Sequence, residues 1–224
     1  MMKIIDMDKY ITKKRTHTSK RGIIMYKNYN ELIEDLSKRQ PNTYDIRNAE
    51  KLADIILELI GYDRLAGATP IVNIAKDFGF TVFRENNIKN NISGNIFIGG
   101  TTKFIYNTDK VIIVGDNEEY FHQRFIIAHE LAHYLMDYLG SQSSNNPTLL
   151  FSRAYEKSGH DAPEEIRADR FAAELLMPAE KFCKHYIKAM KASNFNERYT
   201  MAYLSNYFET KKSSIEKRIN EVIF

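Results

Sequence analysis

The chain has 224 residues, of which 43% are hydrophobic and 27% are charged, and its formal net charge is +3. These ordinary values exclude collagen-like, intrinsically disordered and disulfide-scaffold proteins, and the length allows one domain with appendages. The single cysteine, Cys183, cannot form an intramolecular disulfide, and no apolar run reaches the ~18 residues that a membrane span needs. Since the N-terminus lacks a signal-peptide pattern, we predict a cytoplasmic protein that makes no membrane contact.

Charge is distributed unevenly along the chain. The local net charge is +6 over residues 1–27, −8 over residues 28–180 and +5 over residues 181–224. The first segment shows no sustained apolar periodicity, so we predict that residues 1–40 form a basic, flexible extension. Translation from Met25 instead of Met1 is an open alternative.

Helical periodicity follows this extension. Apolar residues at helical spacing predict a helix from Ile46 to Gly61, and a shorter one from Ile71 to Phe78 that ends at Gly79. Short apolar runs between turn residues then predict strands. These runs cover residues 81–83, 92–98, 104–106 and 111–114. We therefore predict a small, mostly antiparallel sheet of three or four strands.

The pattern after the strands is helical again. A wide apolar stripe predicts a helix over residues 121–139, which Gly140 ends. Residues 141–160 are polar and contain Ser, Asn, Pro and Gly, so we expect a long loop. The next helix is expected to begin with Asp161 as N-cap and Pro163 in its first turn. Together these elements predict an α+β fold in which the small sheet packs on helices.

The sharpest motif is His129-Glu130-Leu131-Ala132-His133, inside the predicted helix 121–139. Residues four apart lie on the same helix face, so the two imidazoles can bind one tetrahedral zinc ion. Glu130 then faces the open coordination position, where it can take a proton from an activated water. We predict one Zn²⁺ per chain. Ordinary histidines on a helix are the alternative reading of this motif.

A zinc site of this kind needs a third protein ligand. Glu165 and Asp169 share one face of the following helix, so one carboxylate can bind the metal while the other accepts a hydrogen bond from a ligand histidine. We favour Glu165 over Glu164 as the ligand and assign the orienting role to Asp169. The alternative is that Glu164 and Glu165 only interact with the helix dipole.

Three separated stretches agree in order and spacing with one known family. They are residues 124–133, residues 151–153, and residues 165–178. In these stretches the chain resembles the ImmA/IrrE metallopeptidases, and the resemblance runs from about residue 46 to the C-terminus. It implies a gluzincin-like fold, zinc bound by His129, His133 and Glu165, and Glu130 as general base. On this basis we predict a zincin-like metallopeptidase domain over residues 41–187.

The resemblance also implies a biological setting. Members of the family typically act on helix-turn-helix repressors in bacterial or phage cytoplasm, and they are tied to mobile elements, stress responses or toxin–antitoxin loci. We therefore predict a zinc endopeptidase of narrow specificity whose protein partner is a helix-turn-helix repressor. The alternative is a non-proteolytic zinc-binding regulatory or sensor module that acts through protein or DNA contacts. The intact Glu130 favours the enzyme, because a scaffold does not need that carboxylate.

Peptide-bond hydrolysis also requires a donor for the tetrahedral oxyanion. The candidates for oxyanion or substrate contacts are Arg153, Tyr155 and His160, in the predicted loop before the ligand helix. A structural ion pair is the alternative role for Arg153. The predicted strand pair 104–106 and 111–114 could offer an edge on which an extended substrate adds a strand, or could simply be a core sheet.

The last segment, residues 188–224, predicts a helix-turn-helix-like tail. One apolar face is followed by a short polar turn and a second apolar face. The faces consist of Met201, Leu204, Tyr207 and Phe208, and of Ile215, Ile219 and Val222. We expect the tail to dock on its own domain or on a protein partner. DNA contact is less favoured, because the last helix offers only Lys217 and Arg218 for phosphate neutralisation.

Overall fold

A four-stranded sheet forms one layer of the part of the chain that the computed structural model describes, namely residues 27–38, 46–61, 67–86, 92–99, 102–139, 151–156 and 162–223. Its strands are β1 (Thr81–Glu85), β2 (Ile92–Ile98), β3 (Lys110–Gly115) and β4 (Phe151–Glu156), in the order β1-β3-β2-β4. β3 pairs parallel with β1 and antiparallel with β2, and β2 pairs antiparallel with β4. The predicted α+β class and mostly antiparallel sheet are confirmed.

Two predictions about this sheet were wrong. Residues 104–106 belong to a short helix, α5 (Thr102–Tyr106), and the predicted loop 141–160 contains the strand β4. The apolar run of α5 was a poor strand signal, because Phe104 is 90% exposed and Ile105 is 68% exposed, so neither side chain packs in the core. β4 becomes a strand by pairing with β2, more than fifty residues earlier, and local sequence carries little information about such pairing.

The long helix that carries the histidine motif packs directly on the sheet. It comprises α6 (Tyr120–His133) and a π-helical turn, η2 (Tyr134–Tyr138), in which the Leu139 N–H bonds to the Tyr134 carbonyl. Gly94 of β2 allows the close approach, because a Cβ at this position would overlap the side chain of Ile126 on α6. The absence of a side chain at Gly94 therefore lets α6 lie close to β2.

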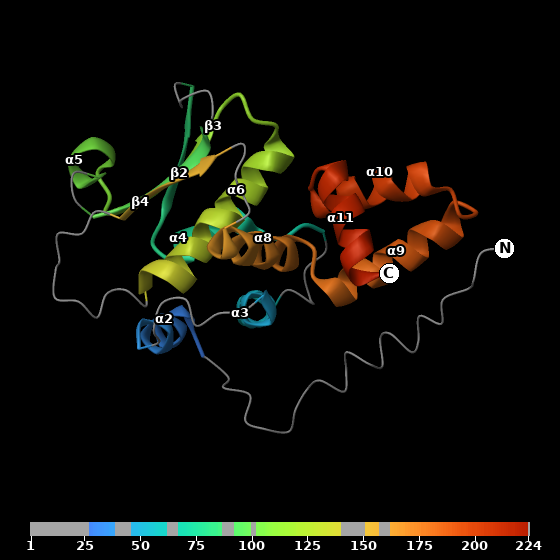
Figure 1. Ribbon diagram of the computed structural model, residues 1–224, viewed down its shortest axis with the longest axis horizontal. Coiled ribbons are helices and arrows are strands. Elements are labelled where there is room, and N and C mark those ends of the chain that lie inside the picture. The colour runs from blue at the N-terminus through green and yellow to red at the C-terminus, as the bar shows by residue number, and fades with distance from the viewer. Residues whose placement is uncertain are drawn as a thin grey trace.

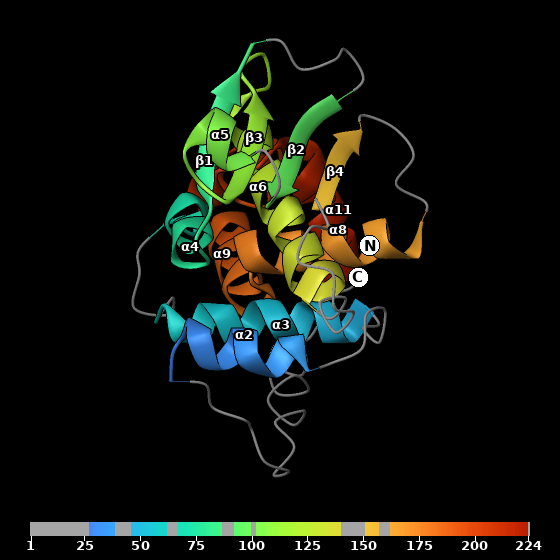
Figure 2. The ribbon, with the colours of Figure 1, turned by 90° about the vertical axis from the view of Figure 1, so that its left-hand side faces the viewer.

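Further helices cover the other side of α6. α8 (Pro163–Leu176) lies against α6, α3 (Ile46–Leu59) packs on α8, and α4 (Ile71–Asp77) contacts α6 and β1. Figure 2 shows α3 and α2 (Tyr29–Ser37) below α6 and α8, with the sheet above. The predicted helices at residues 46–61 and 71–78 are confirmed, and Gly61 and Gly79 both have positive φ.

Two predicted boundaries differ from the structure. α8 begins at Pro163 with Ala162 as N-cap, whereas the predicted cap, Asp161, lies outside the described residues. The segment expected as a flexible extension contains α2, whose Leu32 and Leu36 are buried in the main core. This part of the expected extension therefore belongs to the folded domain, because two buried leucines on one helix face give it an apolar contact. Residues 1–26, including Met25, lie outside the described residues.

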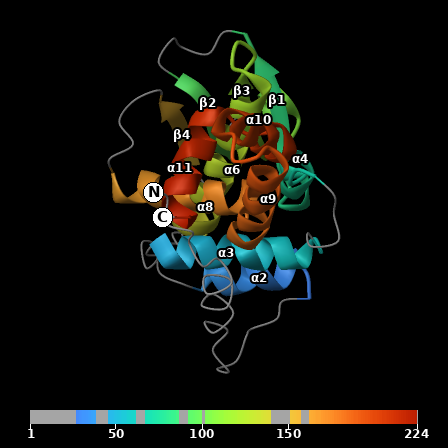
Figure 3. The ribbon, with the colours of Figure 1, turned by 90° about the vertical axis from the view of Figure 1, so that its right-hand side faces the viewer.

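Three C-terminal helices pack on the same core. They are α9 (Ala179–Ala192), α10 (Glu197–Phe208) and α11 (Lys212–Val222), which lie together on one side of the molecule (Figures 1 and 3). Leu204, Phe208 and Ile215 belong to the hydrophobic cluster that also contains the sheet and α6. The tail therefore docks on its own chain. No helix among the described residues is long and apolar enough to cross a membrane.

A buried ion pair fastens α11 to α8. Arg218 is 1% exposed, its Nε donates a hydrogen bond to the Met177 carbonyl oxygen, and its guanidinium binds the carboxylate of Glu174. One of the two cations that the sequence offered for DNA contact is thus committed to the core.

Candidate metal centre

Three side chains converge between α6 and α8. His129 and His133 lie one turn apart on α6, each only 1% exposed, and their Nε2 atoms are 2.9 Å apart. Glu165, in the first turn of α8, places Oε2 3.0 Å from His129 Nε2 and Oε1 3.6 Å from His133 Nε2. One atom from each of the three residues lies within 4.8 Å of the others. Histidines from one helix and a carboxylate from another therefore meet at one point.

A carboxylate lies at the Nδ1 atom of each histidine, on the opposite side of the ring from Nε2. Asp169 Oδ1 lies 3.0 Å from His129 Nδ1, and Asp137 Oδ2 lies 2.7 Å from His133 Nδ1. An ionised carboxylate can only accept hydrogen bonds, so both Nδ1 atoms carry the proton and donate it. In a neutral imidazole, the proton on Nδ1 leaves a lone pair on Nε2, and the Nε2 atoms of both histidines face the Glu165 carboxylate.

This arrangement fits a bound cation. Two lone pairs and a carboxylate at such short separations repel one another, unless a positive charge lies among them. Two imidazole nitrogens and one carboxylate oxygen are a donor set that divalent transition metals accept, and three protein ligands leave a position open for water or substrate. The residues present therefore fit a metal site of the catalytic kind.

The structure brings together most of the residues that the sequence singled out. Glu165 lies against both His129 and His133, and Asp169 lies against His129. Glu164 is not part of the cluster found among the described residues. Glu130 is fully buried on α6, between the two histidines in sequence.

Asp137 is a member of the site that the sequence reasoning missed. It lies four residues after His133, the same spacing that links Glu165 to Asp169, so helix geometry could have indicated it. It falls in the π-turn η2, and a terminal nitrogen of Arg167 lies 3.7 Å from its Oδ1. Such π-turns occur frequently at functional sites.

The turn after the histidines is anchored to the sheet. Lys110 of β3 donates a hydrogen bond of 2.7 Å to the hydroxyl of Tyr134 and one of 3.2 Å to the Phe78 carbonyl oxygen. Burial raises the pKa of Tyr134 to about 12 and lowers the pKa of Lys110. Tyr134 is only 1% exposed, and its hydroxyl accepts the Lys110 hydrogen bond inside the protein. This contact fixes the end of the histidine helix.

The three predicted oxyanion or substrate residues are only partly placed. Arg153 and Tyr155 lie on β4, where their backbones pair with Ile96 and Gly94 of β2, and His160 lies outside the described residues. The predicted substrate edge at residues 104–106 and 111–114 was wrong, because α5 is helical and β3 lies inside the sheet. Among the described strands, the edges are β1 and β4.

Comparison with known proteins identifies the class of this fold and site. Residues 75–220 match the Peptidase_M78 family model, the IrrE N-terminal-like domain, so the chain belongs to this family of metallopeptidases. This confirms the resemblance to ImmA/IrrE proteins. A solved structure of a Mycobacterium tuberculosis transcriptional regulator is similar at 14% identity and a TM-score of 0.49, over 86% of this chain and 52% of that one. The chain thus spans about half the length of that regulator. No curated protein sequence matches.

Proposed function

We propose that the chain is a zinc-dependent endopeptidase of narrow specificity that cleaves a helix-turn-helix repressor or a similar regulator in the cytoplasm. The observation that carries the proposal is the convergence of His129 Nε2, His133 Nε2 and the Glu165 carboxylate, with a carboxylate behind each imidazole. The membership of the metallopeptidase family supports the reaction class. The regulator as substrate rests on the resemblance to the ImmA/IrrE proteins.

The residues of the site have distinct roles in this proposal. His129, His133 and Glu165 hold the zinc ion, and Asp169 and Asp137 orient the two imidazoles. When bound, zinc would polarise the scissile carbonyl and lower the pKa of a water molecule. Glu130 accepts a proton from the attacking water and delivers it to the leaving nitrogen as the C–N bond breaks. The hydroxyl group of that water ends on the carbonyl carbon.

The edge strand β4 provides a surface for an extended substrate. On one side it pairs with β2, and on the other side no strand among the described residues pairs with it. An added strand would satisfy its backbone groups through main-chain hydrogen bonds, which are independent of side-chain identity. We therefore place the substrate on β4 in preference to β3, with Arg153 and Tyr155 in the strand it meets.

The variant Glu130→Gln tests the peptidase directly. The protein is co-expressed with a candidate helix-turn-helix repressor, chosen as one encoded next to its own gene, and mass spectrometry identifies the fragments. Wild type should cleave, Glu130→Gln should bind one zinc ion and not cleave, and the exposed variant Glu58→Gln should behave as wild type. Metal analysis of His133→Ala should show that zinc is lost. If Glu130→Gln retained the full biological effect, the chain would act instead as a non-proteolytic zinc-binding regulatory module.

A further inference from the structure

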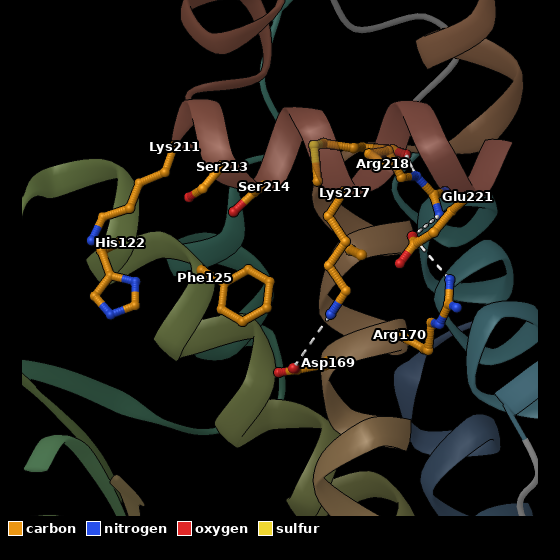
Figure 4. Close-up of a pocket in the computed structure, with 12 residues that line it drawn as sticks. His122, Phe125, Asp169, Arg170, Lys211, Ser213, Ser214, Lys217, Arg218 and Glu221 are labelled. Carbon is orange, nitrogen blue, oxygen red and sulfur yellow. Dashed lines mark hydrogen bonds and ion pairs between the residues drawn. The ribbon is translucent and has the colours of Figure 1, made fainter. Parts of the chain in front are cut away.

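A cavity of about 330 Å³ lies between α6, α8 and α11. Figure 4 shows Ser213, Ser214 and Lys217 descending from α11 toward Phe125 of α6 and Asp169 of α8. Its volume is at the lower end of the range for small-molecule sites, about 300–1,000 Å³. Asp169 belongs to both sites, because its Oδ1 lies 3.0 Å from His129 Nδ1 while the residue also lines this cavity.

Positive charge exceeds negative charge in the lining. The cations are Arg170, Lys211, Lys217 and Arg218, and the carboxylates are Asp169 and Glu221. The arginines are firmly paired, since Arg170 lies 2.9 Å from Glu221 and Arg218 binds Glu174.

The two lysines of the cavity are held only loosely. Lys211 Nζ lies 3.9 Å from Glu119, and Lys217 Nζ lies 3.9 Å from Asp169. Solvated pairs of this kind contribute little, so both ammonium groups can move to a better anion.

The remaining lining suits a phosphoryl group. The hydroxyls of Ser213 and Ser214 form no hydrogen bond with any other described residue, and both residues line the cavity beside the lysines. The two ammonium groups and two hydroxyls come from α11 and its N-cap residue, Lys211, and such donors can meet several oxygens of one phosphoryl group. Phe125, Ala173 and Met177 supply an apolar wall.

We propose that this cavity binds a phosphoryl group, as inorganic phosphate or as a small phosphomonoester, between Lys211 and Lys217, and that its occupancy strengthens metal binding through Asp169. The first part goes beyond the proposed peptidase function and does not require it. The second part rests only on a metal ion at the histidine cluster.

The sign of the coupling follows from the contacts of Asp169. Its Oδ1 accepts the His129 Nδ1–H, while its Oδ2 lies 3.9 Å from the Lys217 ammonium. A phosphoryl group that draws Lys217 away leaves Asp169 as a stronger acceptor, which makes the His129 imidazole a better ligand. An added anion near the cluster also favours a cation there. Both effects tighten metal binding, and by linkage the metal tightens phosphate binding to the same extent.

Binding can be measured on the full-length, zinc-loaded protein by ³¹P NMR and calorimetry with AMP, inorganic phosphate and adenosine. AMP or phosphate should bind saturably, and adenosine should bind at least about tenfold more weakly than AMP. Lys211→Gln and Lys217→Gln should each weaken phosphoryl binding about tenfold or more, because each removes a charge-assisted contact. The matched control is Lys212→Gln, which makes the same charge change on the same helix outside this cavity and should leave affinity unchanged.

The arms of this experiment separate the sources of the phosphoryl group. Phosphate binding without AMP binding assigns the site to the free ion, and tighter AMP binding assigns it to a phosphomonoester. Three results would overturn the site. They are equal phosphoryl affinities of Lys217→Gln and Lys212→Gln, equal binding of AMP and adenosine, and a lack of saturable binding of both AMP and inorganic phosphate.

Zinc competition with a chelator tests the coupling. A saturating phosphoryl ligand should tighten zinc binding about fivefold in wild type and leave it unchanged in Lys217→Gln. Equal zinc affinity with and without the ligand in wild type would overturn the coupling. Neither measurement uses peptide cleavage, so this inference can fail while the peptidase stands, or stand while the peptidase fails.

Discussion

Asp137 Oδ2 lies 2.7 Å from the Nδ1 atom of His133, and both residues belong to one continuous helical stretch. This contact mirrors the one between Asp169 and His129, which crosses from α8 to α6. Each imidazole is therefore held by a carboxylate on its outer nitrogen and presents its inner nitrogen to the other histidine. A metal site depends on such outer contacts for the tautomer and orientation of its ligands.

Replacement of either outer carboxylate should weaken metal binding. We expect Asp137→Ala and Asp169→Ala each to lower zinc affinity about 10- to 100-fold, because the histidine loses the acceptor that fixes its ring. Chelator competition measures this loss. The exposed Asp116→Asn is the control and should bind zinc as wild type does. Wild-type affinity in Asp137→Ala would show that the contact does not orient a ligand.

Metal removal should destabilise the fold around the cluster. At a free zinc concentration of about 100 times its dissociation constant, binding stabilises the native state by about 2.7 kcal/mol. Chelation should therefore lower the melting temperature, and added zinc should restore it. His133→Ala provides the comparison, because its melting temperature should not respond to zinc. A zinc response of the same size in that variant would place the stabilising metal elsewhere.

Gly94→Ala should weaken the packing of α6 on the sheet. A methyl group at this position would overlap Ile126, a branched and buried side chain, so we expect a loss of about 1–3 kcal/mol in the free energy of unfolding. Urea denaturation measures it. In the double variant with Ile126→Ala the overlap is removed, and its cost should be smaller than the sum of the two single costs. Simple additivity would contradict the close approach.

Replacing Arg218 alone should lower the free energy of unfolding more than replacing both Arg218 and Glu174. Arg218→Met leaves the Glu174 carboxylate buried without its cation, which we expect to cost about 3–5 kcal/mol. Adding Glu174→Gln should recover part of this loss in urea denaturation. The exposed Arg198→Met is the control and should change stability by less than about 0.5 kcal/mol. A loss no larger than that of the control would mean that the pair does not fasten the tail.

His185 should make stability depend on pH. Its ring stacks on Tyr207 at 3.8 Å, and burial, together with Lys188 and other nearby lysines, lowers its pKa below the ordinary value of 6.5. The unfolded chain therefore takes up this proton more readily than the folded one. The stability contribution is fully present above pH 6.5 and is lost as the pH falls from that value through the lower folded pKa.

The measurement compares wild type with His185→Gln. As the pH falls from 7 to 5, the melting temperature of wild type should fall by more than the melting temperature of His185→Gln. An NMR titration that gave His185 a pKa of 6.5 or higher would contradict the lowered pKa.

The sequence by itself determined the features that depend only on residues close together in the chain. The histidine motif and the Glu165–Asp169 pair could be read because residues four apart share a helix face whatever surrounds the helix. The ends of α3 and α4 were readable for a similar reason, since Gly61 and Gly79 take backbone conformations that other residues avoid.

Only the tertiary structure decided the features that depend on distant partners. β4 is a strand because β2 pairs with it, and α2 is part of the domain because its leucines reach the core. Arg218 looks like a surface cation in sequence, but Glu174, 44 residues earlier, draws it into the interior. The fit to a metal has the same origin, because the lone pairs of His129 and His133 meet the Glu165 carboxylate only when α8 packs on α6. Helix geometry acts over a single turn, whereas burial and charge pairing act between segments that the fold alone brings together.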